Sequence, residues 1–284
     1  MITFRLGGVP EHFNLPIHLA KQSGKFEEAG IDLVWTDFPG GTGAMCSALK
    51  EDQIDCAILL TEGITADIVK GSPLKILKVY VESPLIWGIH VSANSPYINM
   101  DQMEGKRYAI SRQGSGSHLM SYVDADQRGW KLSESQMVVV GNLEGARNFL
   151  SQAKADIFLW EKYMTKPLVD AGEFRRIGER LTPWPCFVFA ASESFIEKHG
   201  SILTTFFKIV NKSVEAFMQN PEASNIVSER YSLKKEDAKV WFESTKWNTE
   251  SGIDEKILDN IQDWLYRLHI IFAKKLSTQL IYRY

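Results

Sequence analysis

Short turns between predicted strands and helices hold the residues best suited to chemistry. The turn at 39–43 contains three glycines and Thr42, and the turn at 111–117 contains Arg112, two glycines and three serines. Backbone amides at a helix start bind anions such as phosphate or carboxylate, and a guanidinium can add a bidentate contact. These turns predict a site for a small polar or anionic molecule. The alternatives are a plain tight turn for the first and simple capping by serine for the second.

A third turn follows the first predicted strand. Glu11, His12 and Asn14 lie within four residues, after Val9 and before Pro16. Proline suits the first helical turn, where its missing N–H costs nothing. Because ligands bind at the carboxyl ends of strands in open α/β sheets, we expect this turn to line a cleft. A solvated loop with an ordinary asparagine cap is the alternative.

Acidic residues follow three other predicted strands. Glu62 comes directly after Thr61, Glu144 lies two residues after Asn142, and Glu161 comes directly after Trp160. Such carboxylates could bind a cation or a ligand amine. Acids in a first helical turn also stabilise the helix dipole without any ligand, so both explanations stay open.

Three tryptophans lie near predicted strand ends or connections. Trp87, Trp160 and Trp184 could stack on a ligand ring. The chain has 8 tryptophans, so most must belong to the core, which is the competing explanation for each of the three.

Signals for covalent or metal chemistry are weak. The sequence has no Walker loop, dinucleotide glycine pattern, Gly-x-Ser-x-Gly elbow, His-Glu-x-x-His or Cys-x-x-Cys motif. We therefore predict no cofactor, no metal ion and no catalytic residue. The alternative is an enzyme of cofactor biosynthesis, for example of a thiamine pyrimidine, with Glu11, His12 and His118 as acid and base candidates.

Alternating strand and helix patterns position these turns. Such βαβ patterns predict mostly parallel sheets covered by helices on both faces. We expect a two-lobed α/β fold, with lobe I formed by 1–86 plus 190–284 and lobe II, 87–189, inserted into it. Two crossing strands would form a hinge, with the ligand between the lobes. A helix is also expected over 161–171.

Composition narrows the class of protein. With 284 residues, 44% hydrophobic and 24% charged, the chain can build sizeable cores. Its 32 basic and 35 acidic residues give a net charge of −3, which disfavours nucleic-acid partners. No apolar run approaches the roughly 20 residues that span a bilayer, so we expect no membrane insertion.

The cysteines and the N-terminus bear on localisation. The 3 cysteines are scattered and lack disulfide or zinc spacing, which suits a reducing compartment. The start has no features of an export signal. We expect a cytoplasmic monomer or homodimer. A periplasmic or extracellular protein whose leader was removed is the alternative.

Three segments carry a family pattern. They are residues 14–33 (NLPIHLAKQSGKFEEAGIDL), the glycine turn with the Asp55-Cys56-Ala57 strand that follows, and the serine- and glycine-rich start at 111–115. The pattern resembles that of nitrate, sulfonate and taurine solute-binding proteins and of thiamine-pyrimidine synthases. It implies a type 2 periplasmic-binding-protein (Venus flytrap) fold, most similar to a leaderless intracellular branch in bacteria and yeasts.

Two departures from that family affect the expected function. No export signal or lipoprotein cysteine is present, which questions a role in feeding a transporter. The synthases also have a cysteine-rich iron-binding cluster, whereas this chain offers only Cys186, in Pro185-Cys186-Phe187. This second departure argues against synthase chemistry.

We expect a small-molecule-binding protein that closes two lobes on a polar, anionic or heteroaromatic metabolite, linked to thiamine-precursor or sulfonate metabolism. The predicted ligand-binding residues are Val9, Glu11, His12, Asn14, Gly40, Gly41, Thr42, Gly43, Thr61, Glu62, Trp87, Ser111, Arg112, Gly114, Ser115, Gly116, Ser117, Asn142, Glu144, Trp160 and Trp184.

Overall fold

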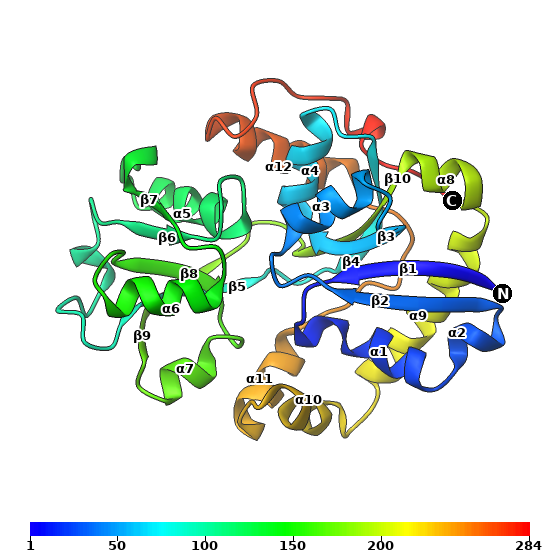
Figure 1. The fold of residues 1–284 in the computed structure, drawn as a ribbon, viewed down its shortest axis with the longest axis horizontal. Helices are drawn as coiled ribbons and strands as arrows, with labels where there is room; N and C mark the ends of the chain where they lie inside the picture. The colour runs from blue at the N-terminus through cyan, green and yellow to red at the C-terminus, as the bar shows by residue number, and fades with distance from the viewer. The chain divides into compact units, whose positions relative to one another are not determined.

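The structure is a computed structural model that describes residues 1–284. The chain divides into two compact units (Figure 1): unit 1 contains residues 1–83 and 184–284, and unit 2 contains residues 84–183. From the sequence we expected these boundaries at 86/87 and 189/190. They fall earlier because the strand β10 (Phe187–Ser192) pairs with strands of unit 1 on both of its edges.

Unit 1 is built on a mixed five-stranded sheet. Its strands are β1 (Ile2–Gly8), β2 (Ile31–Asp37), β3 (Cys56–Leu60), β4 (Leu74–Val81) and β10, in the order β2-β1-β3-β10-β4. β1 runs parallel to β2 and β3, and β10 runs antiparallel to β3 and β4. The carboxyl ends of the first four strands therefore lie at one edge, where β10 begins.

Helices cover both faces of this sheet (Figure 1). One face packs against α3 (Thr42–Lys50), α4 (Thr61–Val69) and α12 (Glu255–Arg267), through a core that includes Met45, Ile64 and Leu258. The other packs against α1 (Leu15–Gln22), α2 (Lys25–Glu28) and α9 (Ile202–Met218). There the rings of Phe4 and Phe206 stack with centroids 4.4 Å apart.

The remaining elements of unit 1 are short. They are η1 (His12–Asn14), α8 (Glu193–His199), α10 (Ala223–Tyr231), α11 (Lys235–Ser244) and η4 (Ser277–Gln279). No helix of the chain is both long enough and apolar enough to cross a membrane.

Unit 2 has a second mixed five-stranded sheet. Its strands are β5 (Ile86–Ser92), β6 (Tyr108–Ile110), β7 (Met137–Val139), β8 (Ile157–Glu161) and β9 (Phe174–Leu181), in the order β7-β6-β8-β5-β9. β6 runs parallel to β7 and β8, while β5 runs antiparallel to β8 and β9. The predicted two-lobed α/β fold with mixed sheets is thus confirmed.

Helices also flank the sheet of unit 2. α6 (Leu143–Ser151) packs Ala146 and Leu150 against Phe158 and Phe174 of the sheet. Asp124 of α5 (Gly116–Gln127) accepts a hydrogen bond from Arg180 of β9 at 2.7 Å. The other helices are η2 (Met100–Gln102), η3 (Glu134–Gln136) and α7 (Lys166–Asp170).

The helix expected over 161–171 is shorter than predicted. Only Lys166–Asp170 is helical, and Glu161 is the last residue of β8. The Glu161 carboxylate accepts hydrogen bonds from the amides of Tyr163 at 2.8 Å and Met164 at 2.6 Å. These bonds satisfy two backbone donors in the turn that connects β8 to α7.

Candidate functional site

The starts of α3 and α4 contact each other at the carboxyl edge of the unit 1 sheet. The Thr42 hydroxyl accepts a hydrogen bond from the Leu60 amide at 3.1 Å, and a Cβ on Gly63 would come within 2.6 Å of Thr42 Cγ2. Gly41 has φ 68° and ψ −158°, a conformation that is essentially restricted to glycine. The predicted glycine turn therefore leads directly into α3, whose first amides lack intrahelical acceptors.

Residues 61–62 are joined to the segment that enters β10. Trp184 Nε1 donates to Glu62 Oε2 at 2.8 Å, and Thr61 Oγ1 donates to the Pro185 carbonyl at 2.6 Å. Glu62 is 1% exposed, and its Oε1 has no hydrogen-bond partner within the protein. Burial raises the pKa of Glu62 to about 7. The structure thus brings together three predicted residues from distant parts of the chain.

The turn after β1 carries a second buried acceptor. Asn14 is fully buried, and its Nδ2 donates to the Val9 carbonyl at 2.7 Å. Because a carbonyl only accepts, the amide nitrogen must face Val9, which leaves Asn14 Oδ1 without a partner within the protein. Glu11 in the same turn is half-buried, and burial raises its pKa to about 7.

His12 lies in an aromatic cluster of unit 1. Its ring centroid is 4.2 Å from that of Trp241 and 5.6 Å from that of Tyr231, and the side chain is fully buried. Burial lowers the pKa of His12 to about 3. An efficient general base has a pKa near the working pH, so this geometry favours packing over acid–base chemistry for His12.

In unit 2, three buried serine hydroxyls meet at the start of α5. Ser117 Oγ accepts from the Ser111 amide at 2.9 Å and lies 3.3 Å from Ser111 Oγ. Ser115 Oγ lies 3.1 Å from Ser117 Oγ and caps the helix by accepting from the His118 amide at 3.3 Å. The amides of Gly116 and Ser117, in the first turn, have no intrahelical acceptor. The predicted serine and glycine turn is thus a compact cluster of donors.

His118 holds the turn that precedes α5. The Gly114 amide donates to His118 Nδ1 at 3.0 Å, so the neutral ring carries its proton on Nε2, which lies 3.3 Å from Glu134 Oε1. The Tyr122 hydroxyl donates to the same carboxylate oxygen at 2.7 Å. His118 therefore fixes the backbone at Gly114, and both ring nitrogens are engaged.

The predicted residues at the start of α6 serve local roles. Asn142 caps α6 by accepting from the Gly145 amide at 2.9 Å. The exposed Glu144 forms an ion pair with Arg147 at 2.7 Å. Both contacts are those of an ordinary helix start, which supports the structural alternative for these two residues.

The two predicted tryptophans of unit 2 face opposite sides of the sheet. Trp160 is half-buried and stacks on Phe158, with centroids 5.2 Å apart. Trp87 is 4% exposed, and its Nε1 has no hydrogen-bond partner within the protein. Trp87 pairs directly with Glu161 in the sheet, and residues paired in this way share a face.

Glu161 and His118 are candidates from the sequence, the first for a cation or amine and the second for acid–base chemistry, that the predicted ligand-binding set does not include. Glu161 is 3% exposed and holds two amides after β8. A glutamate directly after an apolar strand run was the available signal, but the same pattern marks ordinary first-turn acids. No group of three or more His, Cys, Asp or Glu side chains is arranged to hold a metal ion.

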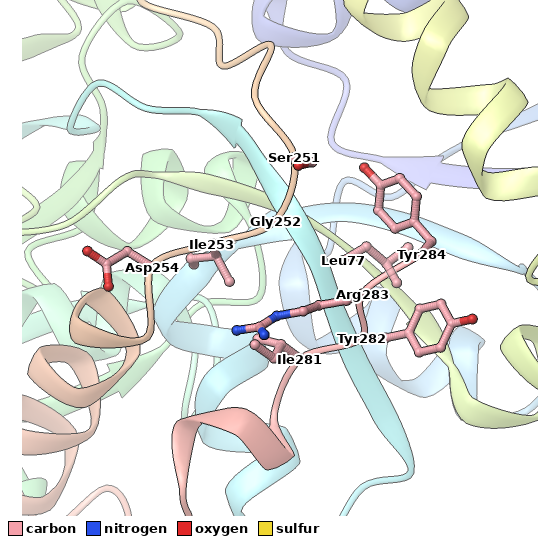
Figure 2. Close-up of a pocket in the computed structure, with 9 residues that line it drawn as sticks. All are labelled: Leu77, Ser251, Gly252, Ile253, Asp254, Ile281, Tyr282, Arg283 and Tyr284. Carbon is pink, nitrogen blue, oxygen red and sulfur yellow. The ribbon is translucent and has the colours of Figure 1, made fainter.

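A separate pocket of about 350 Å³ lies in unit 1, beside β4 (Figure 2). Figure 2 shows Leu77 and the segments 251–254 and 281–284 around it. None of the predicted ligand-binding residues lines this pocket. The last segment contacts β4 through a bridge between Ile76 and Ile281.

Comparison with known proteins identifies the fold of this chain. Residues 87–180 match the model of a family described as Ca3427-like PBP, that is, periplasmic-binding proteins. The Candida albicans CA3427 gene product, described as defining a new family with the generic periplasmic binding protein fold, has a TM-score of 0.92 at 26% identity, over 99% of this chain and 96% of that one. The chain has the type 2 periplasmic-binding-protein fold.

Two alkanesulfonate-type binding proteins share this fold. SsuA from Xanthomonas axonopodis pv. citri, bound to MOPS, has a TM-score of 0.79 at 17% identity, over 100% of this chain and 99% of that one. SsuA from Escherichia coli has a TM-score of 0.73 at 18% identity, over 99% and 97% of the two chains. No curated protein matches the chain by sequence. The predicted resemblance to solute-binding proteins of this type is confirmed.

Proposed function

We propose that the protein binds a small oxyanion-bearing metabolite, with the start of α5 as the anion-binding element. The observation that carries this proposal is the cluster of Ser111, Ser115 and Ser117, whose buried hydroxyls contact one another at the start of a 12-residue helix. Backbone donors, hydroxyl donors and the positive end of the helix dipole favour a negative group at the same place.

The form of the turn supports the same conclusion. Gly114 has φ +73°, a backbone conformation that favours glycine, and His118 holds its amide at 3.0 Å. The turn is therefore preorganised before any ligand arrives. A rigid set of donors loses less entropy on binding than a flexible one.

The related solved structures suggest which oxyanion to test first. SsuA of Xanthomonas is an alkanesulfonate-binding protein bound to MOPS, so sulfonates are the first class. An aminopyrimidine phosphate is the second, because the sequence pattern also resembles thiamine-pyrimidine synthases.

A pair of capping serines gives a matched experiment. Ser115→Ala removes the cap of α5, and Ser192→Ala removes the equivalent cap of α8, where Ser192 Oγ accepts from the Phe195 amide at 3.2 Å. Each loss of a cap is expected to cost about 1 kcal/mol of stability. Isothermal titration calorimetry with MOPS and ethanesulfonate then measures the ligand affinity of each variant separately from its stability.

We expect Ser115→Ala to weaken sulfonate binding at least about 10-fold, since it removes a hydroxyl worth about 1–3 kcal/mol when buried. Ser192→Ala should bind like the parent protein. Equal affinities for all three proteins, or no binding of any sulfonate or of the aminopyrimidine phosphate to the folded parent, would contradict the proposal.

A further inference from the structure

Three large apolar side chains are exposed at the end of α12 and in the segment that connects it to η4 (Figure 1). Tyr266, Phe272 and Leu276 are 50%, 83% and 71% exposed. A single exposed apolar residue needs no explanation, whereas several close together mark an interaction surface. We call the surface formed by these three residues the α12 patch.

The segment that carries the α12 patch is fixed to unit 1. Ile271, directly before Phe272, is 1% exposed. Further along, the buried Gln262 accepts from the Lys275 amide at 2.8 Å and donates to the Lys275 carbonyl at 3.1 Å. The backbone therefore holds Phe272 and Leu276 outward in a defined position. Because neither side chain is covered, folding gains little from their apolar character.

Basic side chains lie beside the exposed apolar ones. Lys274 Nζ is 5.4 Å from the centroid of the Tyr266 ring and forms an ion pair with Asp263. Both members of this pair are exposed, so the contact contributes little stability. The Arg267 guanidinium lies 3.9 Å from the centroid of the Trp264 ring. Two cations are therefore held next to aromatic rings at this surface.

Further cations lie at the end of α4. Lys275 Nζ donates to the Ile68 carbonyl at 2.8 Å, and the exposed Lys70 follows two residues later without an ion pair. Four cations near the patch thus oppose two carboxylates: Lys70, Arg267, Lys274 and Lys275 against Asp259 and Asp263. The surface is locally positive, although the whole chain has a net charge of −3.

The size of the α12 patch favours a lipid surface over a protein partner. A stable protein interface buries about 800 Å² on each side, whereas one aromatic side chain supplies about 150–250 Å². Three side chains do not reach the area that a protein partner needs. A bilayer surface needs less, because a few apolar side chains enter the headgroup region while nearby cations attract anionic lipids.

We propose that the α12 patch docks on the surface of an anionic lipid bilayer. Phe272 and Leu276 enter the headgroup region, and Tyr266 lies at its boundary, where aromatic rings with a polar tip are favoured. The surrounding Lys and Arg side chains face the lipid phosphates. The chain docks without spanning the bilayer, and this docking does not depend on the anion site proposed at α5.

Vesicle sedimentation with the full chain tests this proposal. The probes are vesicles of equal parts phosphatidylglycerol and phosphatidylcholine, and vesicles of phosphatidylcholine alone. We expect the anionic vesicles to bind about 10- to 30-fold more tightly, the range for two net positive charges near a lipid surface. This preference should weaken as salt is added, because salt screens exposed charges. The comparison needs no variant.

Two matched pairs of variants assign the binding to the patch. Phe272→Ala should weaken binding to anionic vesicles about 10-fold, whereas Ile98→Ala, at a position 64% exposed in unit 2, should not. Lys70→Glu should lose most of the preference for anionic vesicles. Lys239→Glu makes the same change in net charge at a side chain 68% exposed in α11 and should keep the preference.

Three results would overturn the proposal. The first is equal binding of the parent to both kinds of vesicle, or binding to neither. The second is a loss in Ile98→Ala or Lys239→Glu as large as in its partner variant. The third is self-association without lipid that requires Phe272, measured by analytical ultracentrifugation, which would assign the patch to a contact between copies of the chain.

Discussion

At the scale of single residues, Glu62 and Glu144 are each the second residue of a helix, α4 and α6. Glu62 is buried against Trp184, whereas Glu144 is an exposed partner of Arg147. Trp184 lies 122 residues from Glu62, so the pairing depends on the strand order. The spacing of the two residues along the chain therefore does not predict their hydrogen bond.

The pH dependence of stability tests the environment of Glu62. Burial raises its pKa from 4.5 to about 7, so the folded protein holds this proton more tightly than the unfolded chain. The resulting stabilisation is complete below pH 4.5 and is lost as pH rises through 7. Glu62→Gln should therefore gain stability relative to the parent between pH 5 and pH 8, by on the order of 3 kcal/mol.

Urea unfolding of both proteins at the two pH values measures this difference. Glu11, whose pKa burial also raises to about 7, is present in both proteins and cancels in the comparison. Glu193→Gln, at an exposed position, serves as the control and should show no such gain. A pH-independent difference between parent and Glu62→Gln would contradict the buried, partly unsatisfied carboxyl group described here.

At the scale of elements, strands and helix starts were largely predictable because they depend on local patterns. Apolar runs gave β3 and β5, and glycines marked the entry to α3. The helix expected over 161–171 begins only at Lys166, because β8 continues through Glu161, which pairs with Trp87 in the sheet. The exact boundary between a strand and the following helix is not visible in apolar periodicity.

The turn before α5 depends on the His118 side chain. His118→Ala removes the acceptor of the Gly114 amide, so the turn should loosen and ethanesulfonate affinity should fall about 10-fold, as for a lost buried hydrogen bond. His118→Asn offers an oxygen near the position of Nδ1 and should recover most of the affinity. Titration calorimetry and thermal unfolding of the three proteins check this, and no rescue by Asn would argue against the positioning role of His118.

At the scale of the whole molecule, the alternation of strands and helices and the family pattern predicted two lobes with mixed sheets. The unit boundary near residue 184 was misplaced because β10 returns to the first sheet between β3 and β4. The amino-acid sequence of a strand does not show with which distant strands it pairs. The fold is shared with sulfonate-binding proteins, while ligand choice depends on particular side chains.

If the start of α5 binds the oxyanion of a small molecule, a crystal structure of the protein grown with MOPS or taurine will show the bound group there. We expect sulfonate oxygens within about 3 Å of the Gly116 and Ser117 amides, with the Ser115 hydroxyl beside them. Sulfonate bound elsewhere, with those amides in contact only with water, would contradict it.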